Sequence, residues 1–168
     1  VWTEILDKVS ESVLILPSGL DVAKCNLKKE IKLRSIDPKR LIFLDYVKTP
    51  QHLARLKLMD LSLDTFPFTG GVTTSDAVRM GLPVLTYLGK SFGSRVSGSV
   101  LKALNMDELI AKSKKEYVNI AIELATDKNK LKKIKRKLKQ NLPGSLLFDT
   151  KSYCHHLEEA FLKVLKKT

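Results

Sequence analysis

The stretch LSLDTFPFTGGVTTSDAVRMGLPVLTYLG, residues 61–89, decides the fold of this chain. It opens with a short apolar run that is typical of a buried strand. Pro67 has no N–H to contribute to a helix, and the pair Gly70-Gly71 allows the backbone to turn tightly. We therefore expect a strand followed by a glycine turn over residues 66–72.

A short helix and a second strand complete this unit. Four residues of types that commonly cap helices follow the turn, namely Thr73, Thr74, Ser75 and Asp76. Gly81 and Pro83 are residue types that end helices, and the apolar residues after them predict a strand over residues 83–88.

This order of turn and helix favours an anion site. The first N–H groups of a helix have no partner within it, and the helix N-terminus carries roughly half a positive charge, so phosphate binds there. The hydroxyls of Thr73, Thr74 and Ser75 would add donors, and Asp76 would accept from a sugar hydroxyl. The spacing alone is equally compatible with a capped helix that binds nothing, because an isolated glycine motif is a weak signal.

The remaining periodicities alternate strands with helices. Further strands are expected over residues 12–17 and 40–46, helices over residues 1–9, 21–35, 49–59, 91–105, 114–125, 127–140 and 150–165, and a connector over residues 106–111.

This alternation predicts an α/β fold: a Rossmann-like parallel sheet flanked by helices, with a helical C-terminal region. We assign one domain, residues 1–168, with a nucleotide-binding core over residues 1–90 and a helical portion over residues 91–168. The carboxyl ends of the strands should converge on one crevice, where such sheets bind ligands.

Composition narrows the class of protein. The chain has 168 residues, of which 43% are hydrophobic, and no apolar run approaches the roughly 20 residues of a membrane span. Cys25 and Cys154 lie far apart and form no metal motif, so we expect partly buried, inert thiols in a reducing, cytoplasmic environment. The start at Val1, without a Met, suggests a piece of a longer protein.

A formal net charge of +12 suggests nucleic acid, an anionic surface or a phosphorylated ligand as partner. Eight basic residues and no acid lie between Lys128 and Lys139, but Leu131, Ile134 and Leu138 recur among them at helical spacing. We therefore interpret this run as a solvated helix face. Since no aromatic residue interleaves with the lysines, specific nucleic-acid binding is not expected. A basic module without catalysis, binding another phosphorylated ligand, nucleic acid or an anionic surface, remains the alternative.

Several blocks together resemble one known family. They are LDTFP, GGVTTSDAVRMGLPVLT, GKSFGSRVSGSVL, ELIAKSKKEYVNIAIELATD and SLLFDTKSYCHHLEEAF, in this order. They are similar to the C-terminal part of the O-GlcNAc transferase and SPINDLY family, and the DTFP wording resembles its bacterial members. The resemblance implies inverting glycosyltransferases with two Rossmann halves (the GT-B architecture), in which the C-terminal half binds the nucleotide-sugar donor.

The resemblance also implies site residues. The diphosphate and ribose would be held by Gly70, Gly71, Val72, Thr73, Thr74 and Asp76. The base would be read by Val47, Thr49, His52 and Arg55, and Arg95 would support the phosphate loop. Three positions depart from other members. Animal members carry histidine and often lysine where this chain has Gly71 and Thr49, and Val72 replaces a threonine found elsewhere in the family.

The resemblance places the catalytic residues, the first Rossmann half and the first strand of the second half before Val1. We expect this chain alone to be inactive and to contain no catalytic residue. The implied donor is UDP-N-acetylglucosamine, with UDP-glucose and GDP-fucose as alternatives, and no metal or other cofactor is expected. The implied partners are a protein or peptide acceptor, the upstream half and tetratricopeptide repeats of the same chain.

Overall fold

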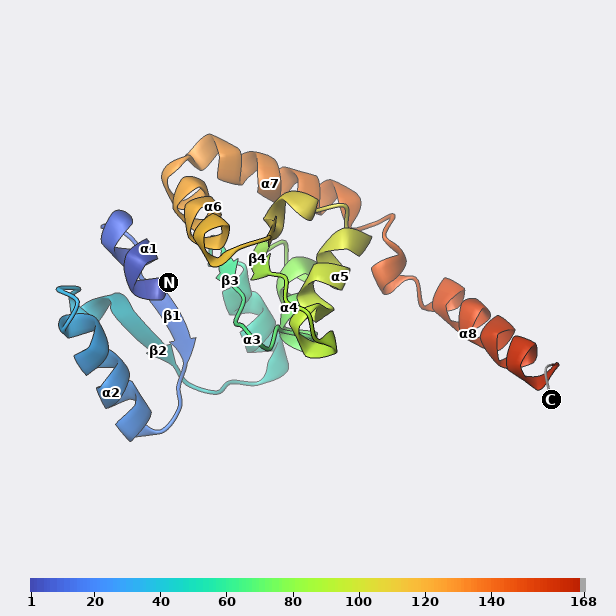
Figure 1. Ribbon diagram of the computed structural model, residues 1–168, viewed down its shortest axis with the longest axis horizontal. Coiled ribbons are helices and arrows are strands. Elements are labelled where there is room, and N and C mark those ends of the chain that lie inside the picture. The colour runs from blue at the N-terminus through green and yellow to red at the C-terminus, as the bar shows by residue number, and fades with distance from the viewer. Residues whose placement is uncertain (167–168) are drawn as a thin grey trace.

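The structure is a computed structural model that describes residues 1–166. Figure 1 shows the described helices: α1 Trp2–Lys8, α2 Asp21–Lys32, α3 Thr49–Leu56, α4 Val72–Arg79, α5 Val96–Ala103, α6 Lys114–Thr126, α7 Lys128–Asn141 and α8 Thr150–Leu165. The described strands are β1 Leu14–Pro17, β2 Leu41–Leu44, β3 Ser62–Leu63, β4 Val84–Tyr87 and β5 Ile110–Ala111. The α/β class with parallel pairing and a helical C-terminal region is confirmed.

The described strands form two parallel sheets rather than one. β1 pairs with β2, and β4 lies between β3 and β5 in the second sheet. The expectation of a plain connector over residues 106–111 is wrong, because Thr86 and Tyr87 of β4 pair with Ile110 and Ala111. A strand of two residues is too short to show a periodic pattern.

Strand β4 places apolar side chains in two layers. Leu85 packs with Tyr117 and Val118 of α6, whereas the neighbouring Val84 packs with Val78 of α4 and with residues of α5. Successive side chains of a strand point to opposite faces, so α6 covers one face of this sheet and α4 and α5 cover the other.

Helix α1 joins the two sheets through consecutive residues. Ile5 belongs to the apolar cluster that contains Leu85 and Tyr117, and Leu6 belongs to the cluster of β2 and α2 that contains Ile31 and Leu41. The side chains of Ile5 and Leu6 are both buried. One turn of helix therefore contributes to the cores on both sides.

The basic helix α7 is amphipathic, as its spacing predicts. Asp127 caps it by accepting from the N–H groups of Asn129 and Lys130, and Ile134 and Leu138 are buried. Three of its lysines pair with acids: Lys130 with Glu123, Lys135 with Asp60 and Lys137 with Glu108.

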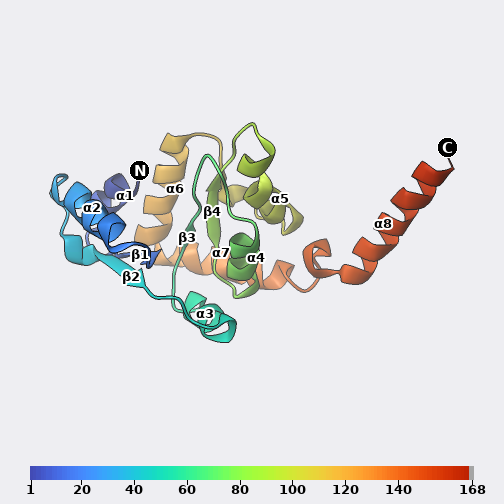
Figure 2. The same cartoon turned by 90° about the horizontal axis from the view of Figure 1, so that it is seen from below.

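Helix α8 projects away from the rest of the chain in both views (Figures 1 and 2). Its predicted apolar residues Tyr153, Leu157 and Phe161 are exposed. Cys25 and Cys154 are exposed too, so the expectation of partly buried thiols is wrong: the apolar spacing of α2 and α8 does not turn these positions toward a core. Among residues 1–166, no helix is long and apolar enough to cross a bilayer.

The start of α8 should respond to acid. The Asp149 carboxylate accepts from the Ser152 N–H at 3.0 Å and from the Ser152 hydroxyl at 2.7 Å, and these bonds hold the pKa of Asp149 below its usual value. Because the pKa is depressed in the folded state, the stabilisation exists above the usual pKa and is lost as pH falls through the lowered one.

We expect Asp149→Ala to fray the first turn of α8 at neutral pH, and Asp149→Asn to fray it less because asparagine also caps helices. Carbon chemical shifts of residues 150–153 across an acid titration would show this. An unchanged first turn in Asp149→Ala would contradict the assigned cap.

Candidate functional site

The glycine turn connects the end of β3 to the start of α4. Helix α4 begins at Val72 with Gly71 as its N-cap and no side-chain cap, somewhat earlier than the capping residues predict. Within residues 1–166, no acceptor is recorded for the N–H groups of Gly71, Val72, Thr73 and Thr74; the first recorded bond is from Ser75 N to the Gly71 carbonyl. Four adjacent donors and the helix dipole thus form an anion-binding geometry.

The peptide groups of Gly70 are fixed on both sides. Its N–H donates to Asp64 Oδ1 at 2.8 Å, and its carbonyl accepts from the Ser97 hydroxyl at 2.8 Å. A Cβ at this position would lie 2.5 Å from Thr73 Oγ1 and 2.6 Å from Thr74 Oγ1. The turn therefore needs glycine at position 70.

The hydroxyls of the helix start are not equivalent. Thr73 is exposed, whereas Thr74 is buried and its Oγ1 lies 2.7 Å from Ser97 Oγ in a hydrogen bond. Ser75 and Asp76 are half-buried, and Val72 is exposed. The structure thus ties the Thr74 hydroxyl to α5 and leaves the Thr73 hydroxyl at the surface.

The candidate base-reading residues follow β2. Arg55 Nε donates to His52 Nδ1 at 3.2 Å, Arg55 Nη2 lies 3.0 Å from the same atom, and Arg55 Nη1 donates to the Asp45 carbonyl at 2.8 Å. A guanidinium only donates, so His52 Nδ1 accepts and Nε2 carries the ring proton. Arg55 thereby links helix α3 to the segment that leads to Val47.

Thr49 and Val47 lie at the entry to α3. Val47 is half-buried, and Thr49 is exposed as the first helical residue. Thr49 has a side chain of a capping type, but Lys48 occupies the N-cap position of this helix and makes no side-chain cap bond. Pro50 is the second helical residue, and its fixed φ angle favours the start of a helix without a side-chain cap.

Helices α3 and α4 share an apolar cluster. Leu56 of α3 packs in the same group as Ala77 and Val78 of α4, with Leu53 against it. The segments predicted to contact base and diphosphate therefore begin two neighbouring helices.

Arg95, which is expected to support the phosphate loop, lies two residues before a serine that contacts this loop. Arg95 is exposed at the N-cap of α5, and no side-chain hydrogen bond or ion pair of Arg95 is recorded within residues 1–166. Ser97 instead contacts the Gly70 carbonyl and the Thr74 hydroxyl, and its N–H donates to Thr69 Oγ1 at 3.3 Å. The SRVSGS block contains the supporting residue, but its spacing does not reveal which member turns inward.

Asp64, at the end of β3, is a second residue that sequence reasoning missed. Its carboxylate is buried and accepts from the Thr86 hydroxyl of β4 at 2.6 Å. Its carbonyl accepts from the buried Tyr117 hydroxyl of α6 at 2.9 Å. Burial and, secondly, the charge of Asp64 raise the pKa of Tyr117 above its ordinary value.

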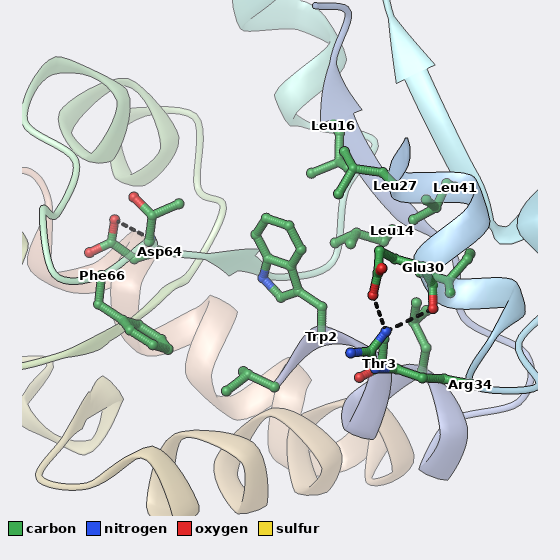
Figure 3. Close-up of a pocket in the computed structure, with 14 residues that line it drawn as sticks. Trp2, Thr3, Leu14, Leu16, Leu27, Glu30, Arg34, Leu41, Asp64 and Phe66 are labelled. Carbon is green, nitrogen blue, oxygen red and sulfur yellow. Dashed lines mark hydrogen bonds and ion pairs between the residues drawn. The ribbon is translucent and has the colours of Figure 1, made fainter. Parts of the chain in front are cut away.

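A cavity of about 490 Å³ lies elsewhere, between the two sheets. Figure 3 shows the indole of Trp2 standing between Leu14 and Leu16 on one side and Asp64 and Phe66 on the other. Its lining is mainly apolar and includes none of the residues expected to bind nucleotide. The cavity lies between the sheets and is bordered by Asp64, Thr65 and Phe66, which lead into the glycine turn.

Known proteins resemble the chain over nearly its whole length. The family described as Glycosyl transferase family 41 matches residues 1–157. A UDP-N-acetylglucosamine--peptide N-acetylglucosaminyltransferase of Caenorhabditis elegans is 35% identical over 99% of this chain and 14% of its own length. The SPINDLY protein of Petunia hybrida, named as a probable UDP-N-acetylglucosamine--peptide N-acetylglucosaminyltransferase, is 31% identical over 99% of this chain and 18% of its own length.

A solved structure, of a mutant O-GlcNAc transferase from Thermobaculum terrenum, has the same fold. It superposes with a TM-score of 0.89 at 28% identity, covering 95% of this chain and 31% of that one. The chain thus spans less than a third of that protein and under a fifth of the two curated relatives. The match to the family over residues 1–157, together with this superposition, shows that the chain belongs to Glycosyl transferase family 41, the O-GlcNAc transferase and SPINDLY family.

Proposed function

We propose that this chain is the donor-binding portion of an inverting protein O-glycosyltransferase, which binds UDP-N-acetylglucosamine for transfer to serine or threonine of proteins. The observation that carries the proposal is the row of four N–H groups at residues 71–74, which have no recorded acceptor in the described part of the chain and follow a fixed glycine turn. The activities for which the relatives are named support the choice of donor.

In the proposed transfer, the acceptor hydroxyl attacks the anomeric carbon and the nucleoside diphosphate leaves. Charge grows on the leaving diphosphate, and preorganised N–H groups stabilise such charge without having to reorganise. The N–H groups of residues 71–74 and the Thr73 hydroxyl would perform this role, while Asp76 would accept from the ribose. The base that activates the acceptor hydroxyl is expected outside this chain.

The same proposal assigns base recognition to the entry of α3. Backbone atoms of Val47, the Thr49 region and the linked pair His52 and Arg55 would surround the base. The guanidinium of Arg55 fixes the imidazole and the Asp45 carbonyl together, so the pair is preorganised before a ligand arrives.

Arg55→Ala should therefore weaken UDP binding and leave inorganic pyrophosphate binding unchanged. We expect a loss of about tenfold or more for UDP, because a hydrogen bond to a charged group contributes about 1.5–3 kcal/mol. Calorimetric titration with both ligands measures the two affinities. Arg136→Ala, on the basic face of α7, is the matched control; an equal loss there would show a general charge effect.

The proposal as a whole is tested by an amide NMR titration of the chain with UDP, GDP and inorganic pyrophosphate. Shifts with UDP confined to residues 47–55 and 70–76 would support it, and a preference for GDP would keep the site and change the donor. Shifts centred on residues 128–139 that vanish steeply with salt would favour the basic-surface alternative. No shift with any ligand would overturn the donor-site proposal for this chain.

A further inference from the structure

The side chain of Asp64 is a buried carboxylate. It is 8% exposed, and no recorded ion pair among the described residues includes it. A buried charge must be compensated by donors. Here Oδ1 accepts from Thr65 N at 3.0 Å and Gly70 N at 2.8 Å, and Oδ2 accepts from Thr86 Oγ1 at 2.6 Å.

The backbone of Asp64 is anchored as firmly as its side chain. Its N–H donates to the Leu85 carbonyl at 3.0 Å, and its carbonyl accepts from Tyr117 Oη at 2.9 Å. The residue is thus fixed to β4 through Leu85 and Thr86, and to α6 through Tyr117. Because the Gly70 N–H donates to this fixed carboxylate, the glycine turn is held in place relative to β4 and α6.

That bond orients the backbone immediately before the donor row. With the Gly70 N–H facing Asp64 and the Gly70 carbonyl facing Ser97, both peptide planes around Gly70 have set directions. The chain then enters α4, so the next N–H groups, of residues 71–74, are the ones left without an acceptor. Asp64 thereby fixes the peptide group that precedes the donor row.

We propose that Asp64 is a positioning residue of the diphosphate site, whose carboxylate orients the glycine turn so that the N–H groups of residues 71–74 face the ligand. This inference rests on the proposed function. It assigns a role to a group whose charge has the same sign as the ligand. A carboxylate near a diphosphate repels it, so only an orienting role makes Asp64 favourable for binding.

The Asp64 carboxylate has two influences on diphosphate binding: it orients the glycine turn, and it repels the negative charge. Whether Asp64→Asn lowers or raises the diphosphate affinity shows which influence dominates. Asparagine has the same shape and can still accept from Gly70 N, but a neutral amide oxygen is a weaker acceptor than a carboxylate oxygen. Its NH₂ group would face the Thr86 hydroxyl, which can accept from it. Loss of orientation weakens diphosphate binding, whereas loss of repulsion alone strengthens it.

The test compares the unchanged chain with Asp64→Asn and with Asp60→Asn, a control that removes an exposed carboxylate. Affinities for UDP, inorganic pyrophosphate and uridine are measured by titration, and exchange of the Gly70 amide proton is measured without ligand. We expect Asp64→Asn to lose about tenfold in affinity for UDP and pyrophosphate, the size of one weakened charge-assisted bond, and to keep its uridine affinity. The Gly70 amide should exchange faster.

Unchanged or tighter pyrophosphate binding by Asp64→Asn would overturn the inference. So would an equal loss for uridine, because a merely structural defect would weaken base and phosphate recognition alike. If the unchanged chain binds none of the ligands, the proposed function fails; Gly70 exchange then shows separately whether Asp64 holds the turn, and an unaltered exchange rate in Asp64→Asn overturns that role.

Discussion

Replacing Gly70 with alanine should abolish most of the affinity for UDP while the chain stays folded. The added Cβ would lie 2.5 Å from Thr73 Oγ1, 2.6 Å from Thr74 Oγ1 and 3.4 Å from Asp64 Oδ1. Exposed Thr73 can rotate away, but Thr74 is held against Ser97. The turn itself must move, and the N–H groups of residues 71–74 move with it.

Two displaced charge-assisted hydrogen bonds correspond to an affinity loss of about a hundredfold or more. Titration calorimetry with UDP gives this ratio directly. Gly144→Ala is the control, because among residues 1–166 no atom beyond the adjoining residues lies within 4 Å of the added Cβ, and Gly144 is in the loop after α7. Equal affinities for the two variants would refute the requirement for glycine at position 70.

Replacing Leu85 with alanine should lower the free energy of unfolding by about 2–5 kcal/mol, the usual range for a buried leucine. Leu85 is 0% exposed, and it lies in the central strand of the three-stranded sheet against Tyr117 and Val118. This loss has two parts. The removed methyl and methylene groups no longer contribute their burial away from water, and a cavity is left between β4 and α6.

Urea unfolding followed by circular dichroism measures this loss. Leu58→Ala provides the control, since the Leu58 side chain is 86% exposed. It should change the unfolding free energy by less than about 0.5 kcal/mol. Similar midpoints for the two variants would mean that the sheet does not depend on the Leu85 contact.

Local patterns in the sequence predicted local structure well. Asp127 caps α7 and Gly81, with φ of 78°, ends α4, because both roles depend on a few neighbouring residues. His52 and Arg55 are three residues apart, a spacing that places two side chains on one helix face, and they are hydrogen-bonded.

Features that depend on distant residues could not be predicted in this way. Strand β5 becomes a strand only through its pairing with Thr86 and Tyr87. The glycine turn is visible in the sequence, but its supports are not: Ser97 reaches Gly70 across 27 residues, and Tyr117 reaches Asp64 across 53. A serine in a helix and an aspartate at a strand end give no signal of such contacts.

The position of α1 between two sheets has a consequence for the order of folding. Every recorded strand ladder pairs strands that follow one another in the chain, β1 with β2, β3 with β4 and β4 with β5. Contacts of this kind close short loops. The packing of Ile5 against Tyr117 and Val118 closes a loop of most of the chain, and the entropy of closure rises with loop length. We therefore expect the two sheets to form first and the docking of α1 to unite them late in folding.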